Sequence, residues 1–339
     1  MHYKLLGRSG LKVSELCLGT MGFGKEWNWG ADKETSFQIL EAFTQAGGNF
    51  IDTANRYTEG TSERIIGEFV HSNRDHYVLA TKYTLHDNLT NVNASGNNRK
   101  NMMRSVEESL KRLNTEFIDL LYLHIWDRLT PVEEVMRGLD DLVRQGKVNY
   151  IGISDTPAWV ISEAQTLAHF MGWSKFIALQ MEYSLLQRTP ERELIPMALQ
   201  HGLTITPWAP LAGGALTGKY LKGDPGRIKE GSIRLNERAV AVTKVVMAVA
   251  EELGVEASHV ALKWTMQQKI SAIPIVGATK LSQLQENIKA IDLKLEPHHM
   301  QQLHEVSKID LGFPGDFFNE DGVKTVTYGG FYDKIEKGF

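Results

Sequence analysis

Short apolar runs alternate with amphipathic segments along most of the 339-residue chain, and this alternation is the feature that most constrains its fold. Two of the connecting segments, residues 102–113 and 132–143, carry apolar stripes at helical spacing. Because strands that alternate with helices form parallel βαβ units, the pattern predicts an α/β protein built on a parallel sheet. The eight predicted strands cover residues 16–18, 49–51, 77–80, 117–123, 148–153, 177–180, 203–207 and 272–276.

Two closures of such a sheet are open at this point, a doubly wound open sheet and a (β/α)8 barrel. A doubly wound dinucleotide-binding domain carries G-x-G-x-x-G after an early strand, and the glycine-rich residues 19–24 and 213–218 have a different spacing. No linker rich in Pro, Gly or Ser divides the chain. We therefore predict one domain over residues 1–339, folded as a (β/α)8 TIM barrel.

A polar residue, a tryptophan or a glycine follows nearly every predicted strand. In a barrel, these positions lie at the carboxyl ends of the strands, where enzymes of this fold keep their chemistry. Stability alone gives no reason for polar side chains at so many strand ends, so the pattern predicts an active site. The positions are Asp52, Lys82, His124, Ser154, Gln180, Trp208 and Gly277.

Asp52 ends a buried strand, and a buried carboxylate is costly unless it is paired. If neighbouring strands bring Lys82 beside it, the two charges satisfy each other, and the cation is expected to lower the pKa of Tyr57 on the loop above. Tyr57 would then exchange a proton with an alcohol or a developing alkoxide, and His124 would orient the carbonyl. Side chains supply no hydride, so a nicotinamide cofactor is inferred.

Each of these residues also has a purely structural interpretation. Lys82 alone could end a strand at the surface, Tyr57 could be a loop aromatic, His124 a structural histidine, and Asp52 a turn cap. A Schiff-base aldolase with Lys82 as nucleophile is a rival enzyme class. No metal site is predicted, because no His-x-His pair follows a strand and the two histidines at 298–299 lie in a polar tail.

The formal charge of −4 gives no electrostatic reason for a nucleic-acid or membrane partner. No apolar run approaches the roughly 20 residues of a membrane-spanning helix, and the first residues lack the pattern of a signal peptide. The single cysteine, Cys17, lies in an apolar run and is expected in the core. We predict a cytoplasmic protein that acts on a small molecule, with self-association left open.

Seven stretches, in order, resemble the aldo-keto reductase superfamily, and the resemblance runs from about residue 11 to 295. It implies a barrel closed by an N-terminal β-hairpin, followed by a tail of long loops at 296–339. It also implies carbonyl reduction by NADP(H) without metal or flavin, through a tetrad of Asp52, Tyr57, Lys82 and His124 with Tyr57 as general acid. Bacterial reductases related to potassium-channel β-subunits are especially similar. The stretches are GNFIDTANRYTEGTSERIIGEF, LATKY, RLNTEFIDLLYLHIWD, GKVNYIGISD, LQMEYSLL, TPWAPLAGGALTGKY and IPIVGATKLSQLQENI.

The resemblance also implies which residues bind the cofactor. At the nicotinamide end these are Gly19, Thr20, Met21, Asp52, Ser154, Gln180 and the stacking Trp208. The pyrophosphate is assigned to Ala209, Leu211, Ala212, Gly213 and Lys219, with Arg227 and Arg234 as alternatives for a phosphate contact. The adenosine and 2′-phosphate are assigned to Gly277, Thr279, Gln283, Glu286 and Asn287.

Two positions depart from the family pattern. Asp155 stands where many relatives have Asn, which weakens this residue as a carboxamide contact. Many NADPH-selective members carry Arg near 279 or 283, and this chain has Thr279 and Gln283 with Lys280 as an alternative cation. We still favour NADP(H) over NAD(H).

Long loops after the strands, residues 22–30 and 84–99, and the tail are expected to border the substrate. An aromatic pocket suited to apolar or sugar-like carbonyls is predicted from Phe23, Trp27, Trp29, Tyr57, His124 and Trp126. The tail, which contains LGFPGDFFNEDG, is expected to dock on the barrel. A second interpretation of the whole chain is a regulatory module that holds NADPH and turns over slowly.

Overall fold

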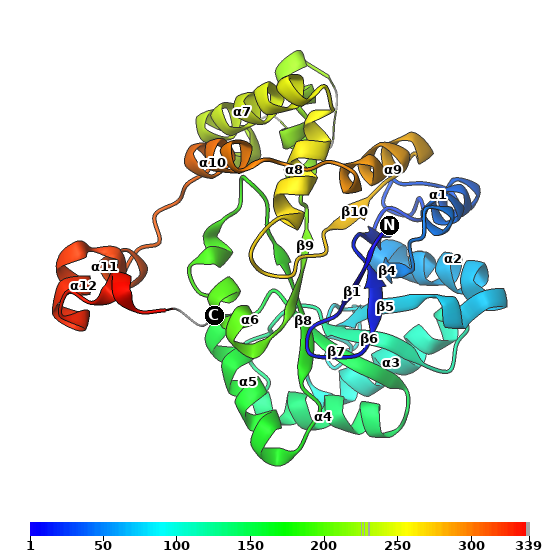
Figure 1. Cartoon of the computed structure of the whole chain (residues 1–339). Helices are drawn as coiled ribbons and strands as arrows, with labels where there is room; N and C mark the ends of the chain where they lie inside the picture. The colour runs from blue at the N-terminus through cyan, green and yellow to red at the C-terminus, as the bar shows by residue number, and fades with distance from the viewer. Residues whose placement is uncertain (225, 227, 230, 337–339) are drawn as a thin grey trace.

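The computed structural model describes residues 1–224, 226, 228–229 and 231–336 (Figure 1). Eight parallel strands form one sheet in the order β10-β3-β4-β5-β6-β7-β8-β9. A parallel bridge between Ile205 and Ala272 joins the two edges, so the sheet forms a nearly closed barrel and the predicted fold class is confirmed. The strands are β3 (Cys17–Gly19), β4 (Phe50–Asp52), β5 (Val78–Tyr83), β6 (Ile118–Leu123), β7 (Val148–Ser154), β8 (Phe176–Glu182), β9 (Thr204–Trp208) and β10 (Ile275–Gly277).

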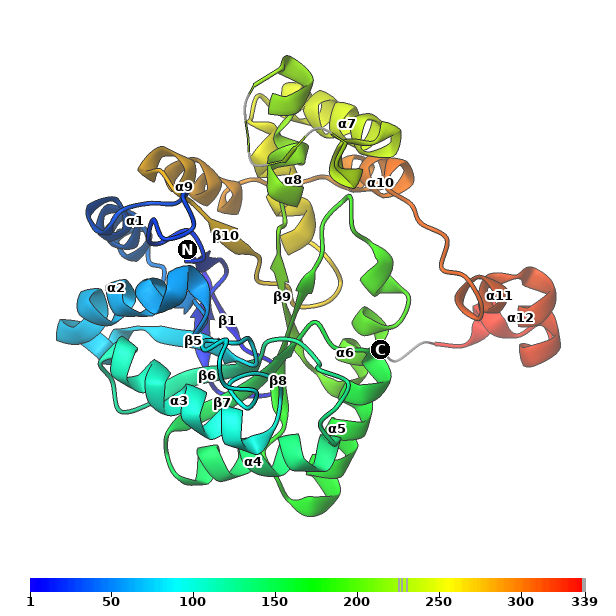
Figure 2. The same cartoon turned by 180° about the vertical axis from the view of Figure 1, so that it is seen from behind.

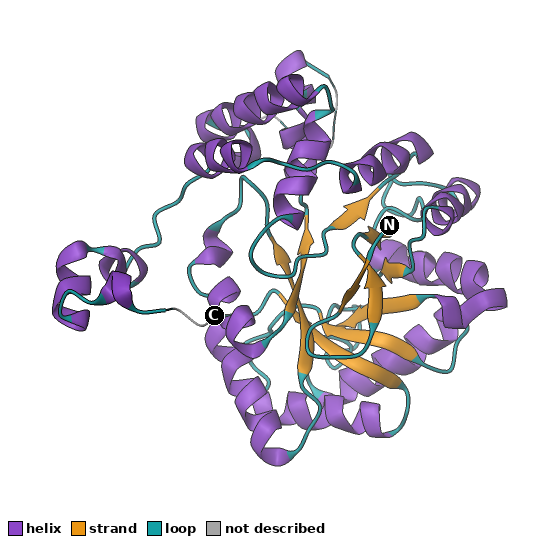
Figure 3. Cartoon of the chain, in the orientation of Figure 1, coloured by secondary structure: helices purple, strands orange, loops and turns teal. Residues whose placement is uncertain are grey.

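Helices surround the barrel (Figure 3). Helix α4 illustrates why they form, because its buried Val135, Met136, Leu139 and Leu142 recur on one face and pack toward the strands. Full burial of one such side chain contributes about 1.5–3 kcal/mol. The helices of this layer are α1 (Lys33–Gln45), α2 (Thr61–Val70), α3 (Arg99–Leu113), α4 (Val132–Arg144), α5 (Ala158–Met171), α6 (Leu194–His201), α7 (Glu237–Leu253), α8 (Ala257–Met266), α9 (Leu281–Ile288) and α10 (Pro297–Val306).

Successive strand residues alternate between two cores. Leu79 and Leu121 belong to the larger core between strands and helices, whereas Ala80 and Leu120 belong to a smaller core. This alternation follows from the two-residue period of a strand. At the carboxyl ends of β4 and β5, the barrel-side positions are taken by Asp52 and Lys82 rather than by apolar side chains.

An antiparallel hairpin of β1 (Tyr3–Leu5) and β2 (Lys12–Ser14) packs on the smaller core, as the resemblance predicted. Leu6 and Val13 are fully buried against it. Gly7 lies so close to the strand wall that a Cβ would meet the carbonyl oxygen of Ile177 at 2.1 Å, and its φ of +58° also favours glycine. The hairpin fills the amino end of the barrel and leaves the carboxyl end for chemistry.

The last described residues leave the barrel. Helix α10 packs beside α7, whereas α11 (Gly315–Asn319) and α12 (Asp321–Tyr328) lie well to one side of the barrel in both views (Figures 1 and 2). Arg192 fixes the departure point by donating to the backbone oxygen of Asp310 at 2.8 and 3.1 Å. Phe318 remains 62% exposed. The prediction that the tail docks on the barrel is therefore wrong for α11 and α12, whose aromatic rings contact one another instead.

Short 3-10 turns complete the described elements. The turns are η1 (Tyr57–Gly60), η2 (His71–His76), η3 (Thr189–Glu191), η4 (Ala212–Thr217), η5 (Lys219–Lys222), η6 (Ile233–Leu235), η7 (Lys289–Ile291) and η8 (Tyr332–Lys334). Among the described residues, the helices are all too short or too polar to cross a membrane.

Candidate active site

A buried ion pair lies at the carboxyl ends of β4 and β5. The Nζ of Lys82 donates to Oδ2 of Asp52 at 2.6 Å, to the backbone oxygen of Thr53 at 2.7 Å and to Oη of Tyr57 at 3.1 Å. Lys82 is fully buried and Asp52 is 2% exposed. The predicted pairing of Asp52 with Lys82 is present, and it reaches Tyr57 through the same ammonium.

Gln180 donates a second hydrogen bond to the carboxylate of Asp52, a contact that the sequence did not indicate. Its Nε2 donates to Oδ1 of Asp52 at 2.9 Å, from β8 on the other side of the barrel. Each carboxylate oxygen of Asp52 therefore accepts a hydrogen bond, as a buried charge requires. Gln180 was assigned by resemblance to a cofactor contact, and its amide nitrogen is engaged with Asp52 in this structure.

The loop that carries Tyr57 is strained and tightly held. Thr58 and Glu59 follow Tyr57 with φ of 46° and 54°, which costs a non-glycine residue about 1–3 kcal/mol. Oγ1 of Thr58 donates to the backbone oxygen of Phe23 at 2.5 Å, and Nε1 of Trp27 donates to Glu59 at 3.1 Å. These contacts fix the phenol over Lys82.

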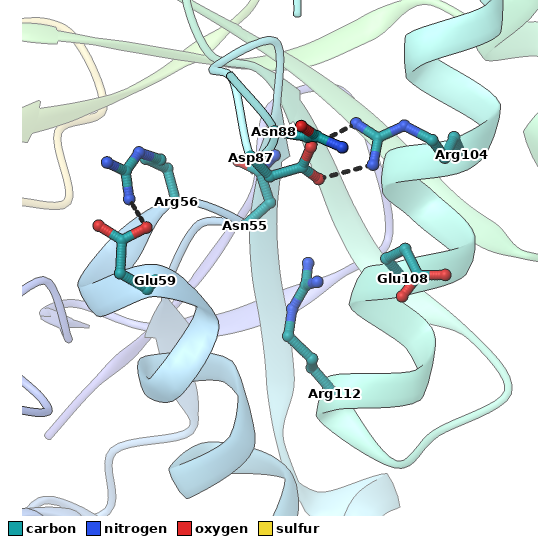
Figure 4. Close-up of a pocket in the computed structure, with 8 residues that line it drawn as sticks. All are labelled: Asn55, Arg56, Glu59, Asp87, Asn88, Arg104, Glu108 and Arg112. Atoms are coloured by element: carbon teal, nitrogen blue, oxygen red, sulfur yellow. Dashed lines mark hydrogen bonds and ion pairs between the residues drawn. The ribbon is translucent and has the colours of Figure 1, made fainter. Parts of the chain in front are cut away.

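A polar pocket of about 300 Å³ lies beside this loop (Figure 4). Its charges are matched, because Arg56 pairs with Glu59 and Arg104 donates to the two oxygens of Asp87 at 2.6 and 2.8 Å. Arg56 and Glu59 flank Tyr57 in sequence, so this network helps hold the loop rather than offering an uncompensated charge to a ligand. The pocket is lined by Asn55, Arg56, Glu59, Asp87, Asn88, Arg104, Glu108 and Arg112.

Glu63 ties helix α2 to the strand that carries Lys82. One oxygen of its fully buried carboxylate accepts from Oγ1 of Thr81, and the other accepts from Nε of Arg112, both at 2.6 Å. Sequence reasoning missed this acid, because a glutamate near the start of an amphipathic helix is an ordinary surface residue by pattern. Its role is to position β5 against α2 and α3.

The protonation states suit a proton donor beside a permanent cation. Burial raises the pKa of Tyr57 above its ordinary value, although Lys82 works to lower it. The expected net lowering is therefore wrong, because desolvation of the phenolate outweighs the attraction of the ammonium. Burial alone would lower the pKa of Lys82, but Asp52 and Tyr57 outweigh it, so the net pKa of Lys82 is raised.

His124 follows β6 and lies beside Tyr57, with ring centroids 6.0 Å apart and an edge-on angle of 80°. Burial, assisted by the charge of Lys82, holds the pKa of His124 well below its usual range, so the imidazole is neutral at neutral pH. Its Nδ1 is buried and has no hydrogen-bond partner among the described residues. An unmatched buried nitrogen of this kind is suited to a polar atom of a ligand.

The residues assigned to the nicotinamide end lie at the same rim. Oγ of Ser154 is buried and finds no partner in the part of the chain that the structure describes, which fits a carboxamide ligand at this position. Trp208 is half-buried at the end of β9, and its Nε1 donates to Oδ1 of Asp155 at 3.1 Å. Gly19 ends β3 and Met21 follows it near this rim. Thr20 is fully buried and donates to the backbone oxygen of Asp52 at 2.9 Å.

The segment after β9 has an unusual backbone. Ala209 and Ala212 have φ of 49°, and Gly213 and Gly214 have φ of 69° and 93°. Leu211, with φ of −96°, precedes the left-handed Ala212, and a right-handed residue followed by a left-handed one can form an anion-binding concavity. The amides of Ala212 and Gly214 donate to the backbone oxygens of Ala209 and Leu211. The backbone of this segment fits the assignment of Ala209, Leu211, Ala212 and Gly213 to the pyrophosphate.

Of the cations predicted near the pyrophosphate, Lys219 packs against Gly214, where an added Cβ would lie 3.1 Å from its Nζ. A guanidinium nitrogen of Arg234 lies 3.3 Å from the position of a Cβ on Gly213, and Nη2 donates to Glu182 at 2.5 Å. The alternative, Arg227, lies outside the described residues. The choice between Arg227 and Arg234 therefore stays open.

The adenosine assignments gather around β10 and α9. Oε1 of Gln283 accepts from the backbone nitrogen of Thr279 at 3.0 Å, and Asn287 is buried one turn further. Lys280 is exposed at the N-cap of α9. The carboxylate of Glu286 is engaged by His259 and Lys289, both at 2.8 Å, while Gly277 is exposed at the end of β10.

A cavity of about 590 Å³ opens beside Trp126 and Asp155 on the carboxyl face. Of the aromatic side chains predicted for the substrate pocket, Trp126 lines this cavity. Trp27 and Trp29 lie near the Tyr57 loop instead, with ring centroids 6.1 Å apart. Phe23 is fully buried in the larger core. The lining residues are Ile125, Trp126, Arg128, Asp155, Thr156, Pro157, Leu179, Met181, Glu182, Gln187, Thr189, Pro190 and Leu194.

The asparagine-rich loop at 84–99 is anchored beside this cavity. Asn97 is fully buried, and its backbone nitrogen donates to Asp127 at 2.7 Å while its Oδ1 accepts from the backbone nitrogen of Asp127 at 2.7 Å. Its Nδ2 also donates to Oγ1 of Thr84 and to the backbone oxygen of Ile125. The loop is thus joined to the segment that carries Trp126.

One group of three potential metal ligands occurs in the described residues, formed by Glu252, His298 and His299. The two histidines lie in α10, not in a polar tail as predicted from sequence. Nδ1 of His299 accepts from the backbone nitrogen of Glu296 at 3.2 Å, so the ring caps the helix and its Nε2 carries the proton toward Glu252. This arrangement accounts for the cluster without a metal ion.

The chain is similar to known proteins over nearly its whole length. Residues 15–308 match the model of the aldo/keto reductase family. An aryl-alcohol dehydrogenase [NADP(+)] of Phanerodontia chrysosporium is 39% identical over 98% of this chain and 93% of its own length. A norsolorinic acid reductase of Emericella nidulans is 39% identical, covering 94% of this chain and 84% of its own length. An aryl-alcohol dehydrogenase of Pestalotiopsis microspora is 37% identical, with 95% and 86% covered. This chain belongs to the aldo/keto reductase family of oxidoreductases.

Proposed function

We propose that the protein reduces an aromatic aldehyde or ketone to the alcohol with NADPH, in a reversible reaction that uses Tyr57 as the general acid. The observation that carries the proposal is the hydrogen bond of 3.1 Å from Nζ of Lys82 to Oη of Tyr57, with Asp52 behind the ammonium. The name of one relative, aryl-alcohol dehydrogenase [NADP(+)], supports the cofactor and the aromatic class of substrate, and the name norsolorinic acid reductase supports the reductive direction.

Tyr57 gives its proton to the carbonyl oxygen as negative charge develops there. Lys82 stabilises the phenolate that remains, and Asp52 keeps the ammonium in place. His124, neutral and with an unmatched nitrogen, directs a hydrogen bond at the same oxygen and orients the carbonyl. The reduced nicotinamide supplies the hydride when it is bound. In the oxidative direction, the same phenolate accepts the proton of the alcohol.

The unmatched Oγ of Ser154 and the indole of Trp208 would hold the nicotinamide, and the left-handed backbone after β9 with either Arg227 or Arg234 would hold the pyrophosphate. Lys280 at the start of α9 offers an exposed ammonium for a 2′-phosphate, which favours NADP(H) over NAD(H).

A Schiff-base aldolase is disfavoured by the state of Lys82. A nucleophilic lysine needs a neutral amine, which a lowered pKa supplies. Here Asp52 and Tyr57 raise the pKa of Lys82 against the effect of burial, and its Nζ donates three hydrogen bonds. Lys82 therefore acts as a fixed cation.

The test follows the absorbance of NADPH with a panel of benzaldehydes, aryl ketones, aliphatic aldehydes and keto sugars, repeated with NADH. We expect the aryl carbonyls to be turned over fastest and NADPH to be preferred. Tight NADPH binding without turnover on the whole panel would indicate a regulatory module and refute the proposal. Substrate trapped on Lys82 by borohydride would refute it as well.

A further inference from the structure

Two of the acidic side chains at the carboxyl rim of the barrel face a cation directly. Asp52 faces Lys82 at 2.6 Å, and Glu182 faces Arg234 at 2.5 Å. The carboxylate of Asp155 has no cation within ion-pair distance among residues 1–224, 226, 228–229 and 231–336, and its side-chain partner is the neutral N–H of Trp208 at 3.1 Å. Lys82 acts on this carboxylate only at longer range, and Arg128 lines the same cavity. Asp155 therefore places a carboxylate without a directly bonded cation at the edge of the indole.

The position of this carboxylate is fixed by the backbone. Asp155 has a φ of 41°, and its backbone nitrogen donates to the backbone oxygen of Gln180 at 3.2 Å while its backbone oxygen accepts from Trp126 at 3.4 Å. Asn and Asp both tolerate a left-handed backbone, and both offer an oxygen to the indole N–H. An asparagine would serve the geometry equally, so what aspartate adds at this position is the charge.

Ser154, the preceding residue, has the unmatched Oγ that fits a carboxamide, and Trp208 is the aromatic side chain assigned to stack on the nicotinamide. Asp155 joins these two positions in the structure. A nicotinamide held by Ser154 and Trp208 would lie within the field of this carboxylate. The oxidised ring is positively charged and the reduced ring is neutral, so a fixed anion distinguishes between them.

We propose that the carboxylate of Asp155, fixed by Trp208, stabilises the oxidised nicotinamide relative to the reduced one and so makes the bound cofactor a stronger hydride donor. The inference rests on the proposed function, because it requires that this rim binds the nicotinamide. It goes beyond that function by assigning to Asp155 a control of the balance between the two redox forms on the protein.

The quantity that responds is the ratio of two dissociation constants, for NADP⁺ and for NADPH. Removing the charge should weaken NADP⁺ binding and leave NADPH binding nearly unchanged. We expect the ratio to rise about tenfold in Asp155→Asn, which for a two-electron couple corresponds to a potential of the bound cofactor about 30 mV less negative. The asparagine keeps the hydrogen bond to Trp208, so the variant isolates the charge.

The test measures both constants by isothermal titration calorimetry. A mildly alkaline pH is used because burial raises the pKa of Asp155 above its ordinary value. Asp155→Gly is the second variant, because glycine adopts the same φ without strain and also removes the charge. The matched control is Asp75→Asn in η2, a segment that precedes β5 and lies at the amino end of the barrel. We expect the higher ratio in both Asp155 variants and the wild-type ratio in the control.

A ratio that stays within about twofold of wild type in the two Asp155 variants would overturn the inference, and so would an equal loss of both affinities. A variant that changes only the KM for the carbonyl would overturn it too, and would assign Asp155 to the substrate cavity it lines. A wild-type protein that binds neither nucleotide would refute the proposed function itself, so the two failures are distinguishable.

Discussion

Replacing Lys82 with Met should lower the stability of the folded protein although it hardly changes the packing of the site. The methionine has nearly the length of lysine and fills the same buried space, but it leaves the 2% exposed carboxylate of Asp52 with Gln180 as its remaining side-chain donor. Breaking a buried pair by removing one partner costs about 3–5 kcal/mol, because the other charge stays buried without compensation. At about 2 °C per kcal/mol, the Tm should fall by roughly 6–10 °C.

The assay is thermal denaturation of the cofactor-free protein at neutral pH, followed by circular dichroism. The matched variant is the double change Asp52→Asn with Lys82→Met, which removes both charges and keeps the size of both side chains. We expect the double variant to regain most of the lost stability, because neutral groups replace the pair. A Lys82→Met protein as stable as wild type, or a double variant no more stable than the single one, would refute the account of a buried, mutually dependent pair.

Three further predictions concern other parts of the molecule. Burial and the charge of Lys82 depress the pKa of His124, so below about pH 6.5 the folded protein binds fewer protons than the unfolded chain and its stability falls. His124→Gln should therefore flatten the dependence of Tm on pH in that range. An unchanged slope would contradict this. Deleting residues 312–339 should leave the Tm within about 2 °C of the full chain, since α11 and α12 lie apart from the barrel, whereas a large fall would show that the tail docks. Lys280→Ala should raise the KM for NADPH roughly three- to tenfold and leave that for NADH unchanged; equal effects on both cofactors would remove Lys280 from the 2′-phosphate site.

The barrel could be predicted from the sequence because its strands are buried on both faces and are nearly continuous apolar runs. The predicted ends are less accurate where a polar residue continues a strand. The run at 77–80 appeared to end before Lys82, yet β5 extends to Tyr83 with Lys82 facing the barrel interior. A pattern of apolar residues does not predict a charged residue inside a strand. Lys82 is tolerated there because its partner, Asp52, lies on the neighbouring strand.

The site was less predictable where it depends on contacts distant in sequence. The bond from Gln180 to Asp52 spans 128 residues, and the bond from Trp208 to Asp155 spans 53. The net direction of the Tyr57 pKa was also missed, because the degree of burial decides it and the sequence does not show burial. The tail was misjudged for a related reason, since aromatic content alone does not specify which surface covers it.

The most direct test of the central claim compares wild type with Tyr57→Phe, which removes a single oxygen. NADPH oxidation in the presence of a benzaldehyde is measured for both proteins, and NADPH affinity is measured in parallel by calorimetry. We expect kcat to fall by about 10²–10⁴ in the variant, because the proton donor is lost, while the Kd for NADPH stays within about threefold. A Tyr57→Phe protein that keeps near-normal turnover would contradict the assignment of Tyr57 as the general acid.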